Sequence, residues 1–272
     1  MLAMPPSDEP RPAATVMLLR DGPRGCEVLL LRRHPRSAFA ADMWVFPGGT
    51  VDPADCVLPA ERWRGIDPEL LAERFGSAPD LVLGLHAAAV RETFEEAGVL
   101  LAVTQGGERP QSDASSWSHV RSRLAERGSV GDWAAWLAEE RLVLDLGALA
   151  YHSRWVTPLQ EPRRYDTAFF VGRVPTNQSA VHDALEVTDQ RWVAPSAALD
   201  LHARGELAMM YPTLQTLAAL SAFGSAAEAV AAADQQPTIR SLRPHIEDGP
   251  GGVRVVHPDD PEYDELDRRA RI

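Results

Sequence analysis

The residues best suited to chemistry in this sequence are three glutamates within five positions. Glu92, Glu95 and Glu96 stand at i, i+3 and i+4, so a helix would carry all three carboxylates on one face. Like charges repel one another there, and an exposed helix face would normally intersperse basic residues at those offsets. Carboxylate oxygens are preferred ligands of Mg²⁺ and Mn²⁺, and such a cation would relieve the repulsion. The triplet therefore predicts a metal site or, taken alone, an acidic solvated face.

The elements around the glutamates favour the metal site. The apolar residues 43–46 run directly into Gly48 and Gly49, and glycine allows a backbone path that other residues resist. The apolar spacing from Leu81 onward predicts a helix that carries the glutamates and ends at Gly98. We therefore expect a strand, a glycine loop, an acidic helix and then a buried strand over 99–103.

Gly49 and residues 91–99, Arg-Glu-Thr-Phe-Glu-Glu-Ala-Gly-Val, resemble the two halves of the signature motif of the Nudix hydrolases. That box reads Gly, five residues, Glu, seven residues, then Arg-Glu-U-x-Glu-Glu-x-Gly-U, with U aliphatic. Thr93 takes one aliphatic position, where its methyl group still packs. The interval from Gly49 to Arg91 holds 41 residues instead of thirteen, so an insertion interrupts the box. Each doubling of a loop's length costs only about 0.6 kcal/mol, so the helix tolerates the insertion.

The first glutamate of the box has two candidate counterparts. Counting forward from Gly49 gives Asp55, and counting back from Arg91 gives Leu83. The sequence leaves both open. An interrupted box is similar to that of the mammalian peroxisomal coenzyme A diphosphatases and their bacterial relatives. This narrower resemblance includes residues 29–33, 44–52, 86–101, 155–158, 163–170 and 191–193.

The resemblance implies roles for the residues of the box. It implies that the Gly48 carbonyl and the carboxylates of Glu92, Glu95 and Glu96 hold Mg²⁺ or Mn²⁺, and that these three carboxylates are the catalytic residues. A metal-held water needs a base, and Glu92 takes that role in some relatives. Arg91 is interpreted as a structural ion pair that keeps the glutamates in register, with phosphate contact as the alternative. Gly49 and Gly98 are supporting positions.

Two basic patches are candidates for substrate binding. Arg163, Arg164 and Tyr165 lie between two predicted strands and place two guanidiniums beside an aromatic ring, a set that suits the phosphates of an adenosine-containing substrate. A solvated hairpin turn is the alternative. Arg33, within the basic run 32–34, follows a strand near the glycine loop and is expected to face the same cleft.

Other reactive or aromatic residues are interpreted as packing. Trp44 and Phe46 are expected in the core, with stacking on a base as the alternative. Cys56 and His86 have no partner at catalytic spacing, so we expect a packed thiol and a hydrogen-bonded imidazole.

The reaction implied by the resemblance is water attack on a diphosphate joined to another group. The narrower resemblance implies coenzyme A or acyl-coenzyme A, cut to phosphopantetheine and adenosine 3′,5′-bisphosphate. The alternatives are ADP-ribose, dinucleotides, nucleotide sugars or nucleoside triphosphates, because surrounding loops choose the substrate. A non-catalytic ligand-sensing module of the same fold is a further alternative, which the intact glutamates disfavour.

Composition limits the environment and the partners. The chain of 272 residues has a net charge of −12, which argues against nucleic-acid polymers and anionic membranes. No run of about 18 apolar residues occurs. Cys26 and Cys56 cannot build a disulfide scaffold, so a reducing cytoplasm is expected. The expected partner is a small-molecule diphosphate, and a homodimer is left open.

The expected architecture is α/β, a Nudix-type α/β/α sandwich with a mixed sheet and extra C-terminal helices. Residues 1–12 are expected to form a flexible tail and residues 13–223 the Nudix domain. Within that domain we expect an insertion over about 53–80, with a helix capped by Asp67, and helical decoration over about 112–141, with a second helix capped by Asp132. Residues 224–272 are expected to be a helix followed by an extended surface tail.

Overall fold

The computed structural model describes residues 9–37, 39–110, 117–127, 130–183, 186–239, 241–249 and 252–270. Most of the predicted N-terminal tail lies outside these residues, as do residues 111–116 of the predicted decoration. Arg11 and Pro12, which were expected in the tail, belong to strand β1. Arg11 donates its backbone N–H to the Arg164 carbonyl, and Pro12, which has no N–H, accepts from Val51.

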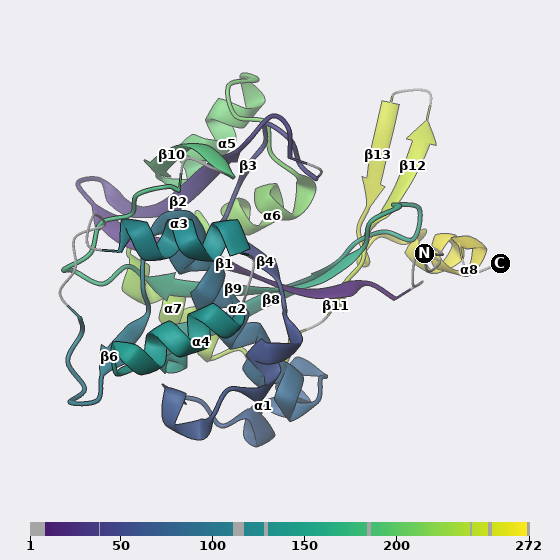
Figure 1. Cartoon of the computed structure of the whole chain (residues 1–272). Coiled ribbons are helices and arrows are strands. Elements are labelled where there is room, and N and C mark those ends of the chain that lie inside the picture. The colour runs from purple at the N-terminus through teal and green to yellow at the C-terminus, as the bar shows by residue number, and fades with distance from the viewer. Residues whose placement is uncertain are drawn as a thin grey trace.

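A mixed sheet forms the middle layer of the molecule (Figure 1). Strands β1 and β9 are parallel, as are β8 and β11, and the other pairs in this sheet are antiparallel. In spatial order the strands are β10 (Val187–Val193), β2 (Gly25–Arg33), β1 (Arg11–Gly22), β9 (Tyr165–Arg173), β8 (Leu149–Val156) and β11 (Ser241–Leu242), with β3 (Trp44–Val45) on β2 and β4 (Gly48–Thr50) on β1.

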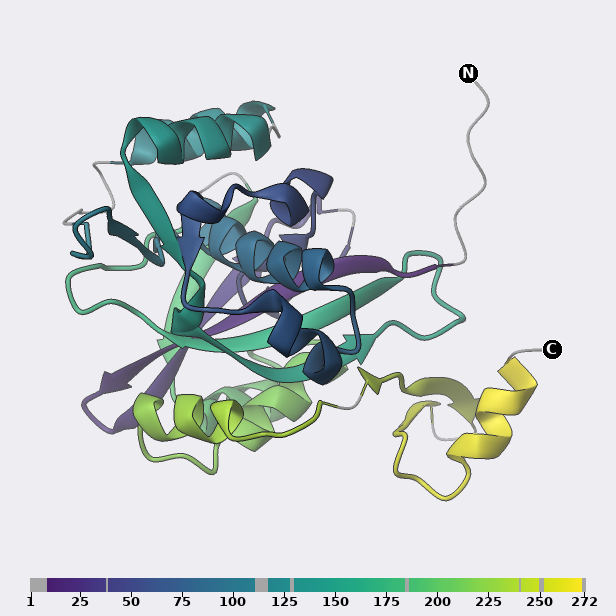
Figure 2. The same cartoon turned by 90° about the horizontal axis from the view of Figure 1, so that it is seen from below.

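The two faces of the sheet bury separate cores. Along β1, Val16 and Leu18 face one core, and Met17 and Leu19 face the other, as the two-residue period of a strand requires. Figure 2 shows helices above and below the sheet. The predicted α/β/α sandwich is confirmed. The helices are α1 (Pro68–Phe75), α2 (Pro79–Ala97), α3 (Ser118–Arg127), α4 (Val130–Glu139), α5 (Pro195–Ala203), α6 (Tyr211–Leu220), α7 (Ala226–Asp234) and α8 (Tyr263–Ala270).

The insertion connects β4 to α2 and contains the capped helix that was predicted. Asp67 accepts hydrogen bonds from two backbone N–H groups of α1, Pro68 is its first residue, and Gly76 ends it in the left-handed conformation. Two 3₁₀ turns precede α1, at Pro53–Val57 and Ala60–Arg62.

The predicted decoration is part of the core rather than an addition to it. Trp133 and Trp136 of α4 are buried against Phe94 of α2, with ring centroids 5.4 and 5.0 Å away. The prediction that Asp132 caps this helix is wrong, because α4 begins at Val130 and Asp132 falls in its first turn.

The buried strand expected over 99–103 is shorter and lies in another sheet. Only β6 (Ala102–Thr104) is a strand, in a small sheet with β5 (Trp63–Arg64) and β7 (Leu142–Asp145), and a third 3₁₀ turn, Leu146–Ala148, follows β7. The side-chain amide of Gln178 bonds both the N–H and the carbonyl of Leu100, at 2.8 and 3.0 Å. This side chain takes the place of a neighbouring strand there.

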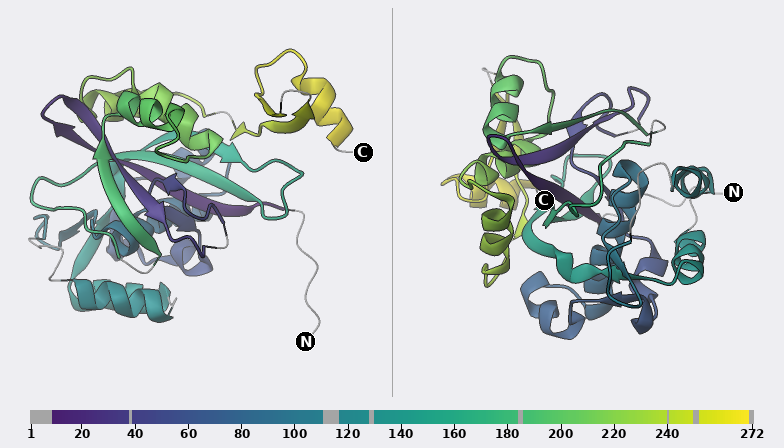
Figure 3. Two further views of the ribbon diagram at one scale, coloured as in Figure 1. Left: turned by 90° about the horizontal axis from the view of Figure 1, so that it is seen from above. Right: turned by 90° about the vertical axis from the view of Figure 1, so that its left-hand side faces the viewer.

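The C-terminal segment is not the extended tail that its composition suggested. After α7 it forms β11, a hairpin of β12 (His245–Gly249) and β13 (Gly252–Val256), and α8. Figure 3 shows this hairpin and helix standing beside the layered body. Within the described ranges, none of the helices combines the length and the apolar character needed to cross a membrane.

Candidate active site

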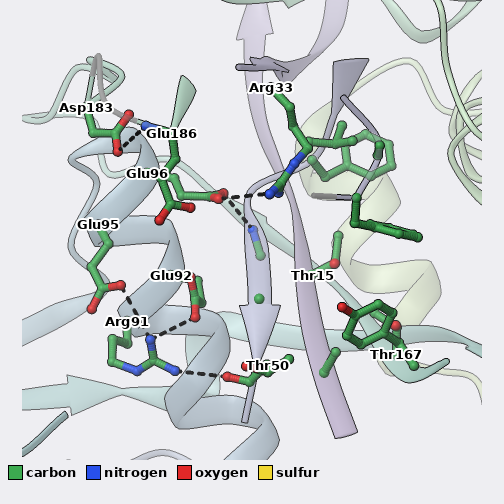
Figure 4. Close-up of a pocket in the computed structure, with 18 residues that line it drawn as sticks. Thr15, Arg33, Thr50, Arg91, Glu92, Glu95, Glu96, Thr167, Asp183 and Glu186 are labelled. Carbon is green, nitrogen blue, oxygen red and sulfur yellow. Dashed lines mark hydrogen bonds and ion pairs between the residues drawn. The ribbon is translucent and has the colours of Figure 1, made fainter. Parts of the chain in front are cut away.

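One cleft of about 420 Å³ gathers the three glutamates. They lie near the end of α2, a helix that Gly98 terminates in the left-handed conformation while donating its N–H to the Phe94 carbonyl. Figure 4 shows Glu92 and Glu96 on the side of α2 that faces the strand β4, with Glu95 farther round the helix. Gly48 and Gly49 of β4 line the opposite wall. The glycine loop and the acidic helix therefore meet although an insertion separates them in the chain.

Arg91 joins two of the glutamates to the glycine strand. Its Nη1 lies 2.8 Å from Glu92 Oε1 and 3.4 Å from Glu95 Oε2, and its Nη2 donates to the Thr50 carbonyl at 3.1 Å. The guanidinium also pairs with Asp55, at Nη2–Oδ2 3.0 Å and Nε–Oδ1 3.3 Å. Of the two counterparts considered for the first glutamate of the box, it is thus Asp55 that contacts Arg91.

Glu96 is held by backbone rather than by Arg91. The Gly48 N–H donates to its Oε2 at 3.0 Å, and Arg33 Nη1 lies 4.0 Å from its Oε1 (Figure 4). Arg33 also lines the cleft, and its Nε is buried without a hydrogen-bond partner among the described residues. A cationic group with unused donor capacity therefore stands beside the acidic cluster.

Burial raises the pKa of all three carboxyl groups. For Glu95, burial and the neighbouring charge of Glu92 raise the pKa to about 7, in spite of Arg91. Burial and Glu92 also hold the pKa of Glu96 well above its usual range. Burial raises the pKa of Glu92, which Arg91 opposes. Burial alone would lower the pKa of Arg91, but the negative charges of Glu92 and Asp55 raise this pKa by more than burial lowers it. When all three are ionised, the glutamates would therefore carry more buried negative charge than Arg91 neutralises.

The donor set fits a hard divalent cation, since it offers carboxylate oxygens that repel one another in a desolvated cleft. In the described part of the chain, however, no three acidic, histidine or cysteine side chains are already assembled around a common point. The contacts explain this, because Arg91 engages an oxygen of Glu92 and of Glu95, and the Gly48 N–H engages one of Glu96. Cation binding would exchange some of these contacts for metal–oxygen bonds.

Two further carboxylates of the cleft were not anticipated from the sequence. Asp183 and Glu186 precede β10 and lie beside Glu96 (Figure 4). Asp183 accepts from the backbone N–H groups of Glu186 and Val187, at 3.2 and 3.1 Å, and so caps the start of the strand. The charge of Glu186 adds to the raised pKa of Glu96. In sequence these two residues are ordinary acidic loop residues, and no spacing signal marks them.

The predicted substrate residues divide into two groups. Arg33 and Tyr165 line the cleft, whereas neither Arg163 nor Arg164 is among the described residues of its wall. The Arg164 Nε donates to the Thr157 carbonyl at 3.4 Å. Arg32 also points elsewhere and forms an exposed ion pair with Asp42 at 2.9 Å.

Of the residues interpreted as packing, Trp44, Phe46 and His86 are buried, and Cys56 is partly buried. Trp44 and Phe46 belong to the core on one face of the sheet, and Phe46 also reaches the cleft wall. His86 is fully enclosed, with Nδ1 2.8 Å from the Val82 carbonyl oxygen, and Cys56 forms no disulfide.

Comparison with known proteins gives concordant matches. The family model described as the NUDT19 Nudix domain matches residues 73–220. The chain is 30% identical over 240 residues to the acyl-coenzyme A diphosphatase NUDT19 of Gallus gallus, a match covering 75% of this chain and 63% of the relative. The Homo sapiens protein of that name is 28% identical over 240 residues, covering 74% and 62%. The matches to these curated relatives thus span less than two thirds of their length.

Among solved structures, a NUDIX hydrolase from Alicyclobacillus acidocaldarius superposes with a TM-score of 0.70 at 29% sequence identity. This match covers 84% of the present chain and 99% of the other. The shared fold therefore extends over nearly the whole of that protein.

Proposed function

Because this chain belongs to the Nudix hydrolases, matching their NUDT19 Nudix domain over residues 73–220, we propose that it hydrolyses the diphosphate of coenzyme A or acyl-coenzyme A. The products are phosphopantetheine, or its acylated form, and adenosine 3′,5′-bisphosphate. The observation that carries the proposal is the convergence of Glu92, Glu95 and Glu96 on Gly48 and Arg33 in one cleft. The curated relatives are named as acyl-coenzyme A diphosphatases, which supports the choice of substrate.

The proposed cofactor is Mg²⁺ or Mn²⁺, held by the three glutamates and the Gly48 carbonyl. When bound, the cation supplies charge neutralisation at the diphosphate and lowers the pKa of an attacking water. The buried, mutually repelling carboxylates support this assignment, since their oxygens are hard donors and their negative charge exceeds what Arg91 offsets.

The residues of the chain bind and orient the substrate. Arg33 donates to phosphate oxygens from the wall of the cleft, and Tyr165 lines the same cleft. Arg91 is a positioning residue that holds Glu92 and Glu95 in register. A carboxylate of the cleft accepts the proton of the attacking water, with Glu92 as the first candidate. Arg163 and Arg164 are proposed contacts for substrate groups that extend beyond the cleft.

We propose that the enzyme works in the cytoplasm on a small molecule, without a nucleic-acid polymer or a membrane as partner. The free thiols of Cys26 and Cys56 suit a reducing compartment. A homodimer is tested by light scattering of the purified chain.

The test is product chromatography after incubation with Mg²⁺ or Mn²⁺ and a matched panel of coenzyme A, acetyl-coenzyme A, ADP-ribose, NADH, UDP-glucose and a nucleoside triphosphate. The Glu96→Gln variant is assayed in parallel. Adenosine 3′,5′-bisphosphate from the coenzyme A compounds alone supports the proposal. Release of AMP from ADP-ribose or NADH would support the hydrolase activity but show that the substrate is not coenzyme A. Absence of product from every compound would favour a ligand-sensing module.

A further inference from the structure

A second cavity of about 340 Å³ opens beside the carboxylate cleft. We call it the apolar chamber. Its boundary with the cleft is formed by residues that line both cavities, namely Thr15, Phe39, Val45, Phe46, Tyr165 and Thr167. A substrate whose diphosphate lies among the glutamates would therefore pass this boundary to place another part of itself in the chamber.

The far wall of the chamber comes from the C-terminal segment. Pro244, Ile246 and Val255 line the chamber and not the cleft. They belong to the segment that contains β12 and β13, the yellow hairpin that stands near the ends of β8 and β9 in Figure 1. The hairpin is attached to the sheet, because Leu242 of β11 pairs with Trp155 of β8, and the rings of His257 and Trp155 meet edge to face at 6.2 Å. The chamber is thus built jointly by the Nudix sheet and the segment after residue 223.

The walls of the chamber select for an uncharged occupant. Trp155, Phe169 and Met210 contribute apolar surface, and Glu161 is the one charged side chain among the described residues of the lining. No lysine, arginine or histidine from the described ranges lines it. The 3′-phosphoadenosine end of coenzyme A carries a phosphate that such walls would leave unpaired and that Glu161 would repel. The pantetheine arm is uncharged, and an acyl chain is apolar.

We propose that the apolar chamber binds the acyl end of acyl-coenzyme A, with Ile246 and Val255 of the C-terminal hairpin contacting the acyl chain. This inference rests on the proposed function, because it assumes that the cleft holds the diphosphate of a coenzyme A compound. It assigns the C-terminal segment a role in substrate selection that the catalytic cleft does not require.

The expected effect lies in KM. Burying one methylene group changes a binding constant about fourfold, and binding that is equal in the ground and transition states lowers KM without raising kcat. The KM should therefore fall about fourfold for each methylene that enters the chamber, up to the length that fills it, while kcat stays nearly constant.

The experiment measures kcat and KM of the full chain with Mg²⁺ for coenzyme A and for its acetyl, butanoyl, hexanoyl and octanoyl esters. The product detected is adenosine 3′,5′-bisphosphate. The same series is run on Ile246→Trp, which fills the chamber while keeping the wall apolar. Leu70→Trp is the matched control, because Leu70 lies exposed on α1, outside both cavities.

The proposal predicts that KM falls as the acyl group lengthens, both in the native protein and in Leu70→Trp. It also predicts that in Ile246→Trp the KM for coenzyme A exceeds the KM for the octanoyl ester by a smaller factor. Hydrolysis of coenzyme A with a KM independent of chain length would overturn it and leave the proposed function standing. The native series decides this even if Ile246→Trp fails to fold. Absence of hydrolysis from every coenzyme A compound would overturn the proposed function, and the chamber assignment with it.

Discussion

Arg91 and Asp55, 36 positions apart in the chain, form a two-point ion pair beside the carboxylate cleft. The second oxygen of Asp55 also accepts from the backbone N–H of Asp52 at 3.0 Å, which completes the cap of the first 3₁₀ turn in the insertion. This contact attaches the start of the insertion to the helix that carries the glutamates. The register of the acidic face therefore depends on a residue outside that helix.

Asp55→Ala should lower the free energy of unfolding by about 3 to 5 kcal/mol, since removal of one partner leaves the buried Arg91 guanidinium short of countercharge. The matched control is Glu206→Ala, which breaks the exposed pair with Arg204 and should cost at most about 1 kcal/mol. Urea denaturation of both variants measures the difference. Equal decreases in the free energy of unfolding would show that the buried ion pair stabilises the fold no more than the exposed one.

Glu95→Gln or Glu96→Gln should lower turnover by orders of magnitude while the fold is retained. Without metal, each variant should unfold at the same temperature as the native chain or higher, because a neutral amide removes a buried, repelled charge. Added Mg²⁺ should raise the unfolding temperature of the native chain and of Glu73→Gln, an exposed control, but not that of the active-site variants. Native turnover in both active-site variants would contradict the metal-site assignment.

Local signals in the sequence predicted the acidic helix and its neighbours. Gly98 ends α2, and Asp67 and Gly76 bound α1, because caps and left-handed glycines act within a few residues of the element that they terminate. The mixed sheet was implied by the resemblance to the Nudix hydrolases. The contacts inside the cleft could not be predicted in this way. The choice between Asp55 and Leu83 depends on a contact across the insertion, and Glu186 reaches the cleft only through strand pairing.

The C-terminal segment shows why composition misled. Its proline, glycine and charged residues indicate a tail, but β12 and β13 pair with each other, and Arg254 bridges to Glu247 at 3.1 Å within the hairpin. Its apolar residues are few, but Leu242 pairs with Trp155 of β8, and the His257 ring meets the Trp155 ring edge to face. Trp155 lies 87 residues before Leu242 and 102 residues before His257 in the chain. A contact between segments so far apart leaves no periodic signal in either of them.

Acid should destabilise the protein through His86. Burial lowers the pKa of this imidazole to about 4, whereas in the unfolded chain its pKa lies near the ordinary histidine value of 6.5. Between these pH values the unfolded state binds a proton that the folded state does not, so the free energy of unfolding falls as pH drops, by up to about 3 kcal/mol. His86→Phe keeps an aromatic ring against Phe75 and Phe170 and removes this proton. Urea titrations from pH 7 to 4 should show the two free-energy curves diverging, and parallel curves would refute the assignment.

Alanine at the two glycines of β4 should separate catalysis from folding. A Cβ at Gly49 would meet the carboxyl group of Glu92, which is the flexible end of a side chain. The carboxyl group can move aside at little cost in stability, but it then no longer occupies its native position in the cleft. A Cβ at Gly48 would meet the Ala14 carbonyl oxygen and the Thr15 backbone in β1, which cannot move without disturbing the strand pairing. Gly49→Ala should therefore lower kcat at least tenfold with a nearly native unfolding temperature, whereas Gly48→Ala should unfold several degrees lower. Calorimetry beside the product assay decides this, and a Gly49→Ala enzyme of native kcat would mean that the position of Glu92 does not limit turnover.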